Sequence, residues 1–548
     1  MGYYHALFFF LSLLSGGLAI GPGSVTNLKI VNQNVSLDGF SRSAVLAGGT
    51  FPGTPILANK GDRFLINVVD QLTDPSMLRS TSVHWHGIFM KDSAWADGTS
   101  FVTQCPIAAN NSFLYDFTPS GQVSPNNSCV HANDVISSGR HFLVSLPFVF
   151  VLFDSVYITV EVDPAMQYCD GLRGPLIIYD PNDPHKHLYD VDDATTIISL
   201  ADWFHESSRT APFPLFYTTN TINGKGRFTG GPAADLAVIS VKRGSRYRFR
   251  LISMSCEPNF IFSIDKHSMT VIEADGVSTQ PLVVDSIQIF TGQRYSFVLN
   301  ANQRVSNYWV RSLPNLGDTT FANGVNSAIL RYAGAEKCDP KTNQTASTRP
   351  LVESNLHPLV PTVVPGLPFV GGADVNINLN IGLDFTTFRF NLNGVSFSPP
   401  TAPALLQILS GAQLASDLLP SGSYFALPPN KVIEVTIPGG ADPAGPHPFH
   451  LHGHNFFVLR STNTSEYNFV DPVIRDVVNT GFPGDNVTFR FVTDNAGPWF
   501  LHCHIDLHLD IGLAVVFAED TGSVSKEVIP SAWNNLCPIY DALDPSQL

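Results

Sequence analysis

WFLHCHIDLH, residues 499–508, places a cysteine between two histidines, with a further histidine close behind. In a β-strand, successive side chains point to opposite faces, so His502 and His504 would share one face while Cys503 points from the other. One such strand can serve two metal sites, one on each side. Imidazole and thiolate donors suit copper, and two histidines with one cysteine form the trigonal blue-copper arrangement. The stretch therefore predicts a copper protein built on strands.

Two further histidine motifs lie upstream, SVHWHG at 82–87 and HPFHLHGH at 447–454. With the first stretch they define the candidate copper ligands His84, His86, His447, His450, His452, His502, Cys503, His504 and His508. Cys503 with His447 and His508 has the composition of a blue-copper site, and the other six histidines can surround a separate cluster. Zinc fits less well, because structural zinc sites do not use paired His-x-His motifs from three distant segments. Purely structural histidines are the remaining alternative, and we expect His454 not to be a ligand.

The composition fits such a protein and narrows its partners. The chain has 548 residues, 44% hydrophobic and 14% charged, which predicts a large core spread over about three or four domains of ~150 residues. The formal charge of −15 makes nucleic acid and anionic membranes poor partners. The 42 glycines and 40 prolines suit many short strands joined by turns.

Short alternating segments recur along the chain and predict an all-β fold. Each is short, often contains β-branched or aromatic residues, and is bounded by turn residues. We expect strands within KGDRFLINVVDQL, TTIISLADW, SRYRFRLISM, RYSFVLNA, NKVIEVTIPG and DNVTFRFVTD. The pattern predicts three consecutive β-sandwich or barrel domains, over residues 20–183, 184–352 and 353–548.

The N-terminus predicts secretion. MGYYHALFFFLSLLSGGLAIGP has a short apolar run followed by small residues, so we interpret residues 1–19 as a signal peptide. That run and a second one, 142–153, are both shorter than the ~20 residues of a membrane span. The seven cysteines leave at least one without a disulfide partner, and Cys503 is the candidate. Sequons that suit a secreted glycoprotein lie at Asn34, Asn110, Asn343, Asn463 and Asn486.

Beyond these motifs, the chain resembles the multicopper oxidases and, among them, the fungal laccases. The resemblance covers nearly all residues after the signal and rests on HWHGIFM, WADGTSFVTQCPI, QYCDGLRGPLIIYDPNDP, RLISMSCEPNFIFSID, HPFHLHGHNFFVLR and GPWFLHCHIDLHLDIGLAVVF. It implies three cupredoxin-like Greek-key domains and disulfides Cys105–Cys537 and Cys169–Cys256. It also implies four coppers: type 1 held by His447, Cys503 and His508, type 2 held by His84 and His450, and a type-3 pair held by His86, His452, His502 and His504.

The resemblance further implies a reaction. Phenols and diphenols would lose single electrons at the type-1 copper, and four electrons would reduce O2 to two waters at the other three coppers. Glu257 in SCEPN would accept the phenolic proton, with a plain surface carboxylate as the alternative. Asp97 in WADG would relay protons toward the oxygen site, or would only cap its Asp-Gly turn. Leu513 takes the axial type-1 position, where it cannot coordinate, which favours Cu(I) and a higher potential.

One copper loop of the family is missing from its expected place. Family members read close to GTFWYHSHLST just before QYCDGLRGP, and that HSH supplies one ligand to each type-3 copper; residues 123–166 contain no such motif. RHFLVSLPFVF, residues 140–150, can nevertheless be encoded by codons that read Gly-Thr-Phe-Trp-Tyr-His-Ser-His-Leu-Ser one base later. We interpret 123–166 as two translated introns around a small exon, with a genuine insertion as the alternative. In the present reading frame, the type-3 pair would be incomplete and O2 reduction impaired.

Two other functions are alternatives. A ferroxidase of the same family would need further acidic residues beside the type-1 copper, where the sequence shows only the laccase-like Glu257. A non-enzymatic protein would hold type-1 copper alone and be inert toward O2. We expect a secreted, extracellular and monomeric laccase, a benzenediol:oxygen oxidoreductase that acts on small phenolic or aromatic substrates such as those of lignin, with no nucleic-acid or membrane partner.

Overall fold

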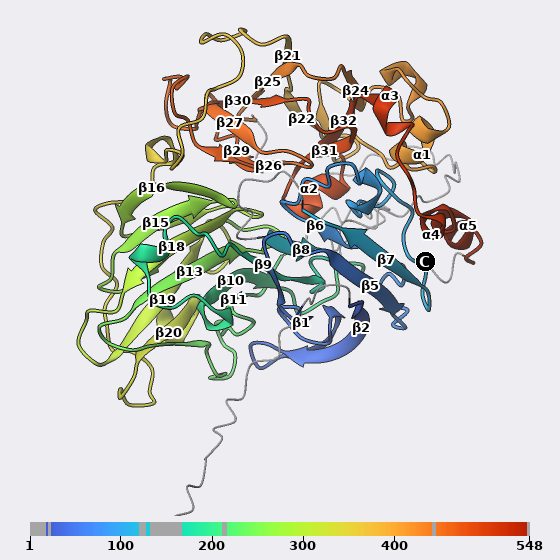
Figure 1. Cartoon of the computed structure of the whole chain (residues 1–548). Helices are drawn as coiled ribbons and strands as arrows, with labels where there is room; N and C mark the ends of the chain where they lie inside the picture. Colours follow the sequence, from blue (N-terminus) through green and yellow to red (C-terminus); the bar gives the residue numbers. More distant parts are fainter. Residues whose placement is uncertain are drawn as a thin grey trace, which may run out of the picture.

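The chain folds into three β-sandwich units that follow one another along the sequence (Figure 1). The computed structural model describes residues 18–19, 24–119, 128–131, 167–210, 216–440 and 445–544. The expected signal peptide, apart from Leu18–Ala19, and the anomalous segment 123–166, apart from Ser128–His131, lie outside the described residues. In Figure 1 the first unit is blue, the second green and the third orange to red.

The first unit pairs a sheet of order β3-β2-β5-β7 with one of order β1-β4-β9-β8-β6. Its strands are β1 Leu18–Ala19, β2 Thr26–Ser36, β3 Ser41–Ala47, β4 Ile56–Asn59, β5 Phe64–Gln71, β6 His84–Trp85, β7 Ser112–Phe117, β8 Ser128–His131 and β9 Arg173–Tyr179. Alternate residues of β5, Phe64, Ile66 and Val68, are buried, as the period of two requires for a strand with one face on the core. The backbone of β8 pairs antiparallel with β6.

The second unit pairs a six-stranded sheet, β11-β10-β13-β18-β15-β16, with a five-stranded sheet, β12-β20-β19-β14-β17. Its strands are β10 Ile197–Trp203, β11 Thr219–Ile222, β12 Val238–Val241, β13 Arg246–Ser253, β14 Phe260–Ile264, β15 Met269–Ala274, β16 Val277–Val284, β17 Ile287–Ile289, β18 Arg294–Asn300, β19 Asn307–Pro314 and β20 Ser327–Tyr332. β10 and β13 are buried over nearly their whole length, since both lie inside the larger sheet.

The third unit contains the sheets β21-β25-β30-β27-β28 and β24-β32-β31-β26-β29 and the hairpin β22-β23. Its strands are β21 Val375–Asn378, β22 Ile381–Asp384, β23 Arg389–Leu392, β24 Tyr424–Leu427, β25 Val432–Pro438, β26 Pro448–Leu451, β27 Phe456–Arg460, β28 Ile474–Arg475, β29 Val477–Asn479, β30 Asn486–Val492, β31 Gly497–Cys503 and β32 Ala514–Glu519. The central strand β31 is buried at every position, so its histidine and cysteine are held inside the protein.

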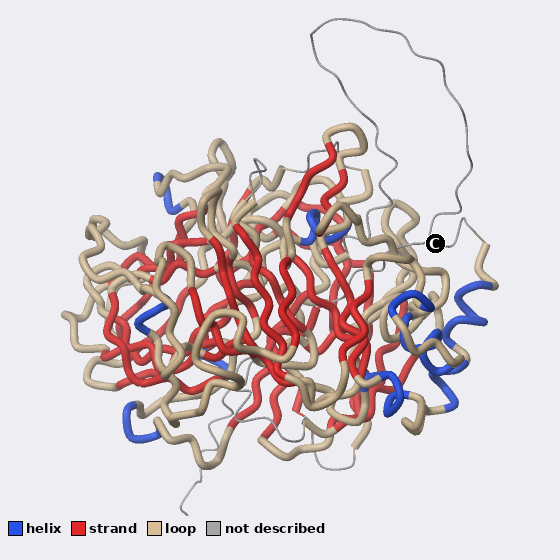
Figure 2. Tube along the Cα trace, turned by 90° about the horizontal axis from the view of Figure 1, so that it is seen from above, coloured by secondary structure: helices blue, strands red, loops and turns tan. Residues whose placement is uncertain are grey.

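Helices are short, and most of them lie at the edge of the strand core (Figure 2), while the residues of α2 are mostly buried. They are α1 Ala404–Leu409, α2 Asp506–Asp510, α3 Thr521–Val524, α4 Ser531–Asn534 and α5 Leu536–Asp541, with 3₁₀ turns η1 Ala94–Ala96, η2 Lys186–Leu188, η3 Ala194–Thr196, η4 Ala322–Gly324, η5 Glu353–Asn355 and η6 Ala415–Asp417. Among the described residues, no helix has the length and apolarity needed to cross a membrane. The all-β prediction is confirmed, and β5, β10, β13, β18, β25 and β30 lie within the six segments in which strands were expected.

The C-terminal end of the third unit is fastened to the first unit. Cys537 on α5 forms a disulfide with Cys105. Nearby, the buried Trp533 donates from Nε1 to the carbonyl oxygen of Thr103 at 3.0 Å. The contact between these two units matters because the histidine motifs belong to both.

Candidate functional site

Three of the predicted ligands converge in the third unit. His447 lies just before β26, Cys503 ends β31, and His508 lies on α2. Cys503 Sγ is 3.7 Å from His447 Nδ1 and 3.6 Å from His508 Nδ1, and the two nitrogens are 3.1 Å apart. All three side chains are buried. Two imidazole nitrogens and one thiol sulfur around a common point fit a trigonal copper site.

The protein encloses this trio tightly. The ring of Phe390 on β23 lies 5.3 Å from the His447 ring and 4.7 Å from the His508 ring, measured between centroids. Leu513 is fully buried, its carbonyl oxygen accepts from the Cys503 N–H at 3.0 Å, and its own N–H donates to the His508 carbonyl at 2.9 Å. Leu513 therefore connects the backbone of two donors.

The other six histidines form a second, larger cluster between the first and third units. His84 stacks on His452 with ring centroids 3.9 Å apart, and His86 stacks on His450 at 3.8 Å. His452 Nε2 is 3.2 Å from the Nε2 of His502. His504 is near His86, with ring centroids 5.1 Å apart, so the structure brings all six together.

The placement of the motifs on strands was only partly predicted. β6 ends at Trp85, β26 at Leu451 and β31 at Cys503, so the second histidine of each pair follows the end of its strand. The ligand motifs sit where strands give way to turns at the contact between units. His508 comes from the short helix α2, which the spacing alone did not indicate.

The hydrogen bonds of this cluster leave nitrogens available for metal. His84 Nδ1 donates to the carbonyl oxygen of Asp97, and His450 Nδ1 to that of Asp476, both at 2.9 Å. The buried Nε2 atoms of His84 and His450 have no hydrogen-bond partner among the described residues. Histidine ligands of metals characteristically donate their other N–H to such acceptors, so these residues fit a copper site.

Burial keeps four of the six imidazoles, those of His450, His452, His502 and His504, neutral. Removal from water, reinforced by neighbouring histidines, lowers the pKa of His450 and His502 well below the ordinary value. Burial also lowers the pKa of His452 to about 4 and that of His504 to about 3. The neutral imidazole is the form that binds metal, so the cluster is prepared for ligation at neutral pH.

Asp97 joins two of the histidines. Its Oδ2 is 2.9 Å from His452 Nδ1 and its Oδ1 is 3.2 Å from His84 Nδ1, while Thr99 Oγ1 donates to Oδ2 at 2.6 Å. Burial alone would raise the pKa of Asp97, but His452 and His84 lower it overall. The side chain thus contacts two candidate ligands and does more than shape a turn. Gly98 follows at φ +85°, and a Cβ there would collide with the carbonyl oxygen of Val83.

Glu257 lies in the loop after β13 and is held by its backbone. The carboxylate of Asp202 on β10 accepts from the N–H groups of Cys256 at 2.7 Å and Glu257 at 3.0 Å. Asp202 is itself fully buried and paired with Arg173 at 3.0 Å. Burial, with the nearby Asp202 charge, raises the pKa of Glu257 to about 7. Glu257 is half-buried, so it is not a freely solvated surface carboxylate.

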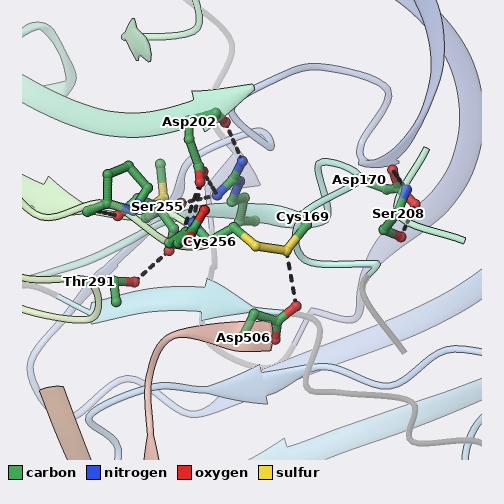
Figure 3. The surroundings of a disulfide bond; sticks show 12 residues. Cys169, Asp170, Asp202, Ser208, Ser255, Cys256, Thr291 and Asp506 are labelled. Carbon is green, nitrogen blue, oxygen red and sulfur yellow. Dashed lines mark hydrogen bonds and ion pairs between the residues drawn. A yellow bond between two sulfur atoms is a disulfide. The ribbon is translucent and has the colours of Figure 1, made fainter. Parts of the chain in front are cut away.

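The disulfide Cys169–Cys256 connects this loop to the first unit, and contacts with Asp506 connect it to the third (Figure 3). Cys169 Sγ lies 3.2 Å from Asp506 Oδ2, and the Asp506 N–H donates to the Cys256 carbonyl at 3.0 Å. Asp506 lies between His504 and His508 in the sequence, so the loop carrying Glu257 is held directly against the segment that carries these candidate copper ligands. Sequence reasoning did not identify this role of Asp506.

The remaining predicted residues have other surroundings. His454 Nε2 is 2.8 Å from Glu519 Oε2, away from the groupings of potential metal ligands. Among the described side chains, Cys338 and Cys503 form no disulfide, while the side chain of Cys129 and the segment expected to carry HSH lie outside the described residues.

A second residue was missed by sequence reasoning: Thr291, whose Oγ1 donates to the Ser255 carbonyl at 2.5 Å and lies 3.3 Å from His504 Nδ1. Figure 3 shows it beside the disulfide loop. No sequence motif identifies Thr291 as a neighbour of His504, because the two residues lie far apart in the sequence.

Comparison with known proteins gives a consistent result. Family models described as multicopper oxidase match residues 29–128, 194–335 and 397–523. Laccase-4 of Trametes villosa is 55% identical over 97% of this chain and 96% of its own, and laccase-1 of Pleurotus ostreatus is 56% identical over 98% and 96%.

Solved structures agree. The crystal structure of laccase from Botrytis aclada superposes with a TM-score of 0.78 at 28% identity, covering 96% of this chain and 94% of that one. Fet3p, a multicopper oxidase that functions in iron import, gives 0.76 at 23% identity over 95% and 96%, a likeness that concerns the fold alone. The three sandwich units are thus cupredoxin-type domains, and the chain belongs to the multicopper oxidase family, among relatives that are fungal laccases.

Proposed function

We propose that this protein is a secreted laccase that oxidises phenols and diphenols one electron at a time and passes the electrons to O2. The observation that carries the proposal is the buried trio His447, Cys503 and His508, with Cys503 placed between two histidines of the second cluster. Because Cys503 is bonded through the backbone to His502 and His504, a short covalent path joins the two groups of donors.

The residues present fit copper in both groups. His447, Cys503 and His508 would hold a type-1 ion, His84 and His450 a type-2 ion, and His86, His452, His502 and His504 would contribute to a type-3 pair. Bound copper would supply one-electron oxidation of the phenol and reduction of O2 to water. In balance, four phenols lose one electron and one proton each, and one O2 with those four electrons and protons becomes two waters.

The chain's own side chains handle the phenol and its proton. Glu257 would accept the hydrogen bond of the phenol hydroxyl and then its proton, and a pKa of about 7 suits that exchange near neutral pH. Asp202 fixes the Glu257 backbone, so the carboxylate is positioned before substrate arrives. Asp97, whose carboxylate contacts His84 and His452, would move protons beside the second cluster of six histidines.

The relatives support this activity and leave the ferroxidase alternative without a specific observation in its favour. Both are named laccases, and both match over nearly their whole length. We infer domain limits at 20–183, 184–352 and 353–548, supported by sheets that draw their strands from residues up to 179, from 197 to 332 and from 375 onward. An extracellular, monomeric protein with residues 1–19 removed is part of the same proposal. Removal would take away the two-residue edge strand β1 and leave β4 as the edge of its sheet.

The test uses purified, copper-loaded protein and 2,6-dimethoxyphenol. We expect a blue absorption band from the copper–thiolate bond, which the phenol should bleach in the absence of O2. Protein that also carries the His-Ser-His loop should consume one O2 for every four phenols oxidised. Cys503→Ser should lose both the band and the activity. Phenol oxidation that persists without Cys503, or a blue protein that no phenol reduces, would contradict the proposal.

A further inference from the structure

We propose that the ring of Tyr217 forms a wall of the phenol site beside Glu257 and limits the size of the phenols that can be oxidised. This inference rests on the proposed function and deepens it by naming a residue that sets specificity. Tyr217 is half-buried just before β11, outside the copper-ligand motifs.

The position of Tyr217 follows from what it packs against. It lies on a small buried cluster made of Tyr168, Cys169, Phe204, Cys256 and Leu507. Two members of that cluster are direct chain neighbours of functional residues, because Cys256 precedes Glu257 and Leu507 precedes His508. Tyr217 therefore packs against side chains that are adjacent in sequence to Glu257 and to the type-1 candidate His508.

The ring is also held in place. Its hydroxyl donates to the carbonyl oxygen of Leu316. Gly317 adopts φ +72°, and a Cβ at that position would lie only 2.5 Å from the Tyr217 hydroxyl oxygen. The Phe204 ring packs edge-on against it with centroids 6.3 Å apart. Because the hydroxyl is hydrogen-bonded and the ring is packed against Phe204, moving this side chain away to admit a large substrate would cost free energy.

The carboxylates of Asp202 and Glu257 act electrostatically on the Tyr217 hydroxyl. Burial, together with the negative charges of Asp202 and Glu257, raises the pKa of the Tyr217 hydroxyl. Tyr217 therefore remains a neutral phenol over the working pH range. The preceding residue, Phe216, is 75% exposed, so the chain lies at the protein surface at this point.

The experiment compares a small and a bulky phenol, 2,6-dimethoxyphenol and its 4-phenyl derivative. Loss of the blue band is followed without O2, which reports phenol oxidation independently of O2 reduction. In Tyr217→Ala we expect the bulky-to-small ratio of rate constants to rise about tenfold, because a pocket wall of this size discriminates by that order. Tyr217→Trp should lower the ratio. Tyr217→Phe keeps the ring and should leave the ratio within about twofold of the wild type.

A second readout needs no oxidation. Kd values of two electron-poor phenols, 4-cyanophenol and 4′-cyano-4-hydroxybiphenyl, are measured by calorimetry, and their ratio should shift in the same direction. Phe216→Ala, a change of similar size at an exposed neighbour, should shift neither ratio. If Tyr217→Ala does not retain the blue band, Tyr217→Leu is measured in its place with the same expectation.

The outcomes separate the two proposals. Unchanged ratios in a blue Tyr217→Ala or Tyr217→Leu protein that still oxidises 2,6-dimethoxyphenol would overturn the role of Tyr217 and leave the laccase proposal intact. Failure of both phenols to bleach the wild-type protein would overturn the laccase proposal and, with it, this inference.

Discussion

The carboxyl group of Glu257 should make phenol oxidation depend on pH. Its pKa of about 7 means that the proton-accepting carboxylate forms only as the pH approaches neutrality. For a phenol that stays protonated throughout, kcat/KM should therefore rise with pH and level off above about 7. Glu257→Gln should remove this rise and lower kcat/KM about 100-fold. Ferrocyanide, which has no proton to give, is the control donor and should be oxidised equally well by both proteins.

The same group predicts the sign of a stability change. The folded-state pKa lies above the ordinary value, so between about pH 4.5 and 7 the folded protein holds the proton more firmly than the unfolded chain. This contribution is fully present at low pH and is lost as the pH rises through about 7. Urea unfolding of wild type and Glu257→Gln should show that only the wild type loses this increment, and equal pH slopes would contradict it.

Thr291 should matter for copper retention. Its hydroxyl proton goes to the Ser255 carbonyl, so its oxygen is free to accept from His504 Nδ1, which leaves Nε2 for the metal. Thr291→Val keeps the shape but removes the acceptor, and loss of such an outer contact typically weakens metal binding 10–100-fold. A chelator should then remove copper from the second histidine cluster faster than it does in the wild type, while the blue band stays. Thr291→Ser is the matched control, and equal chelation of Val and Ser variants would refute this role.

At the scale of elements, strands and ligands differ in how far sequence predicts them. β5 and β30 were predictable because each alternates or clusters apolar residues between turn signals, which is local information. The candidate ligands could be selected from the sequence because copper sites use rare residue types at short spacing. The hydrogen bond between Asp97 and His452 joins residues that are 355 positions apart in the sequence, and no local pattern predicts it. The same holds for Asp202 beneath Glu257, and for the strand ends that fall within each His-x-His motif.

β9 and β10 meet through a buried ion pair whose loss should be costly. Arg173 and Asp202 are both fully buried, and Asp202 also supports the Glu257 loop. Arg173→Met leaves a buried carboxylate without its partner and should lower the free energy of unfolding by about 3–5 kcal/mol. The matched control is Arg63→Met, which breaks the exposed pair with Asp116 and should cost less than about 1 kcal/mol. Urea unfolding measures both, and similar losses would show that burial is not the deciding factor.

On the scale of the whole molecule, each unit contributes to one assembly. The first supplies His84 and His86, the third supplies the other candidate ligands, and the second supplies Glu257 with its supporting residues. The disulfides Cys105–Cys537 and Cys169–Cys256 tie the first unit to the third and to the second. The site therefore depends on how the units are placed relative to one another, and we expect an intact third unit alone to bind only the proposed type-1 ion.

This dependence makes copper content the decisive whole-molecule measurement. The described residues supply six histidines to the second cluster. The family's HSH loop, which would supply two more, is expected at the place now taken by residues 123–166. We expect the transcript across codons 120–168 to lack the two introns and to encode His-Ser-His in frame. The protein from that transcript should bind four coppers per chain and reduce O2. Protein that retains residues 123–166 of the present sequence should bind fewer, keep the blue band and fail to reduce O2, because each type-3 copper lacks one ligand. Genomic codons that cannot spell His-Ser-His one base later, or four coppers bound by the chain with this segment, would show that 123–166 is a genuine insertion.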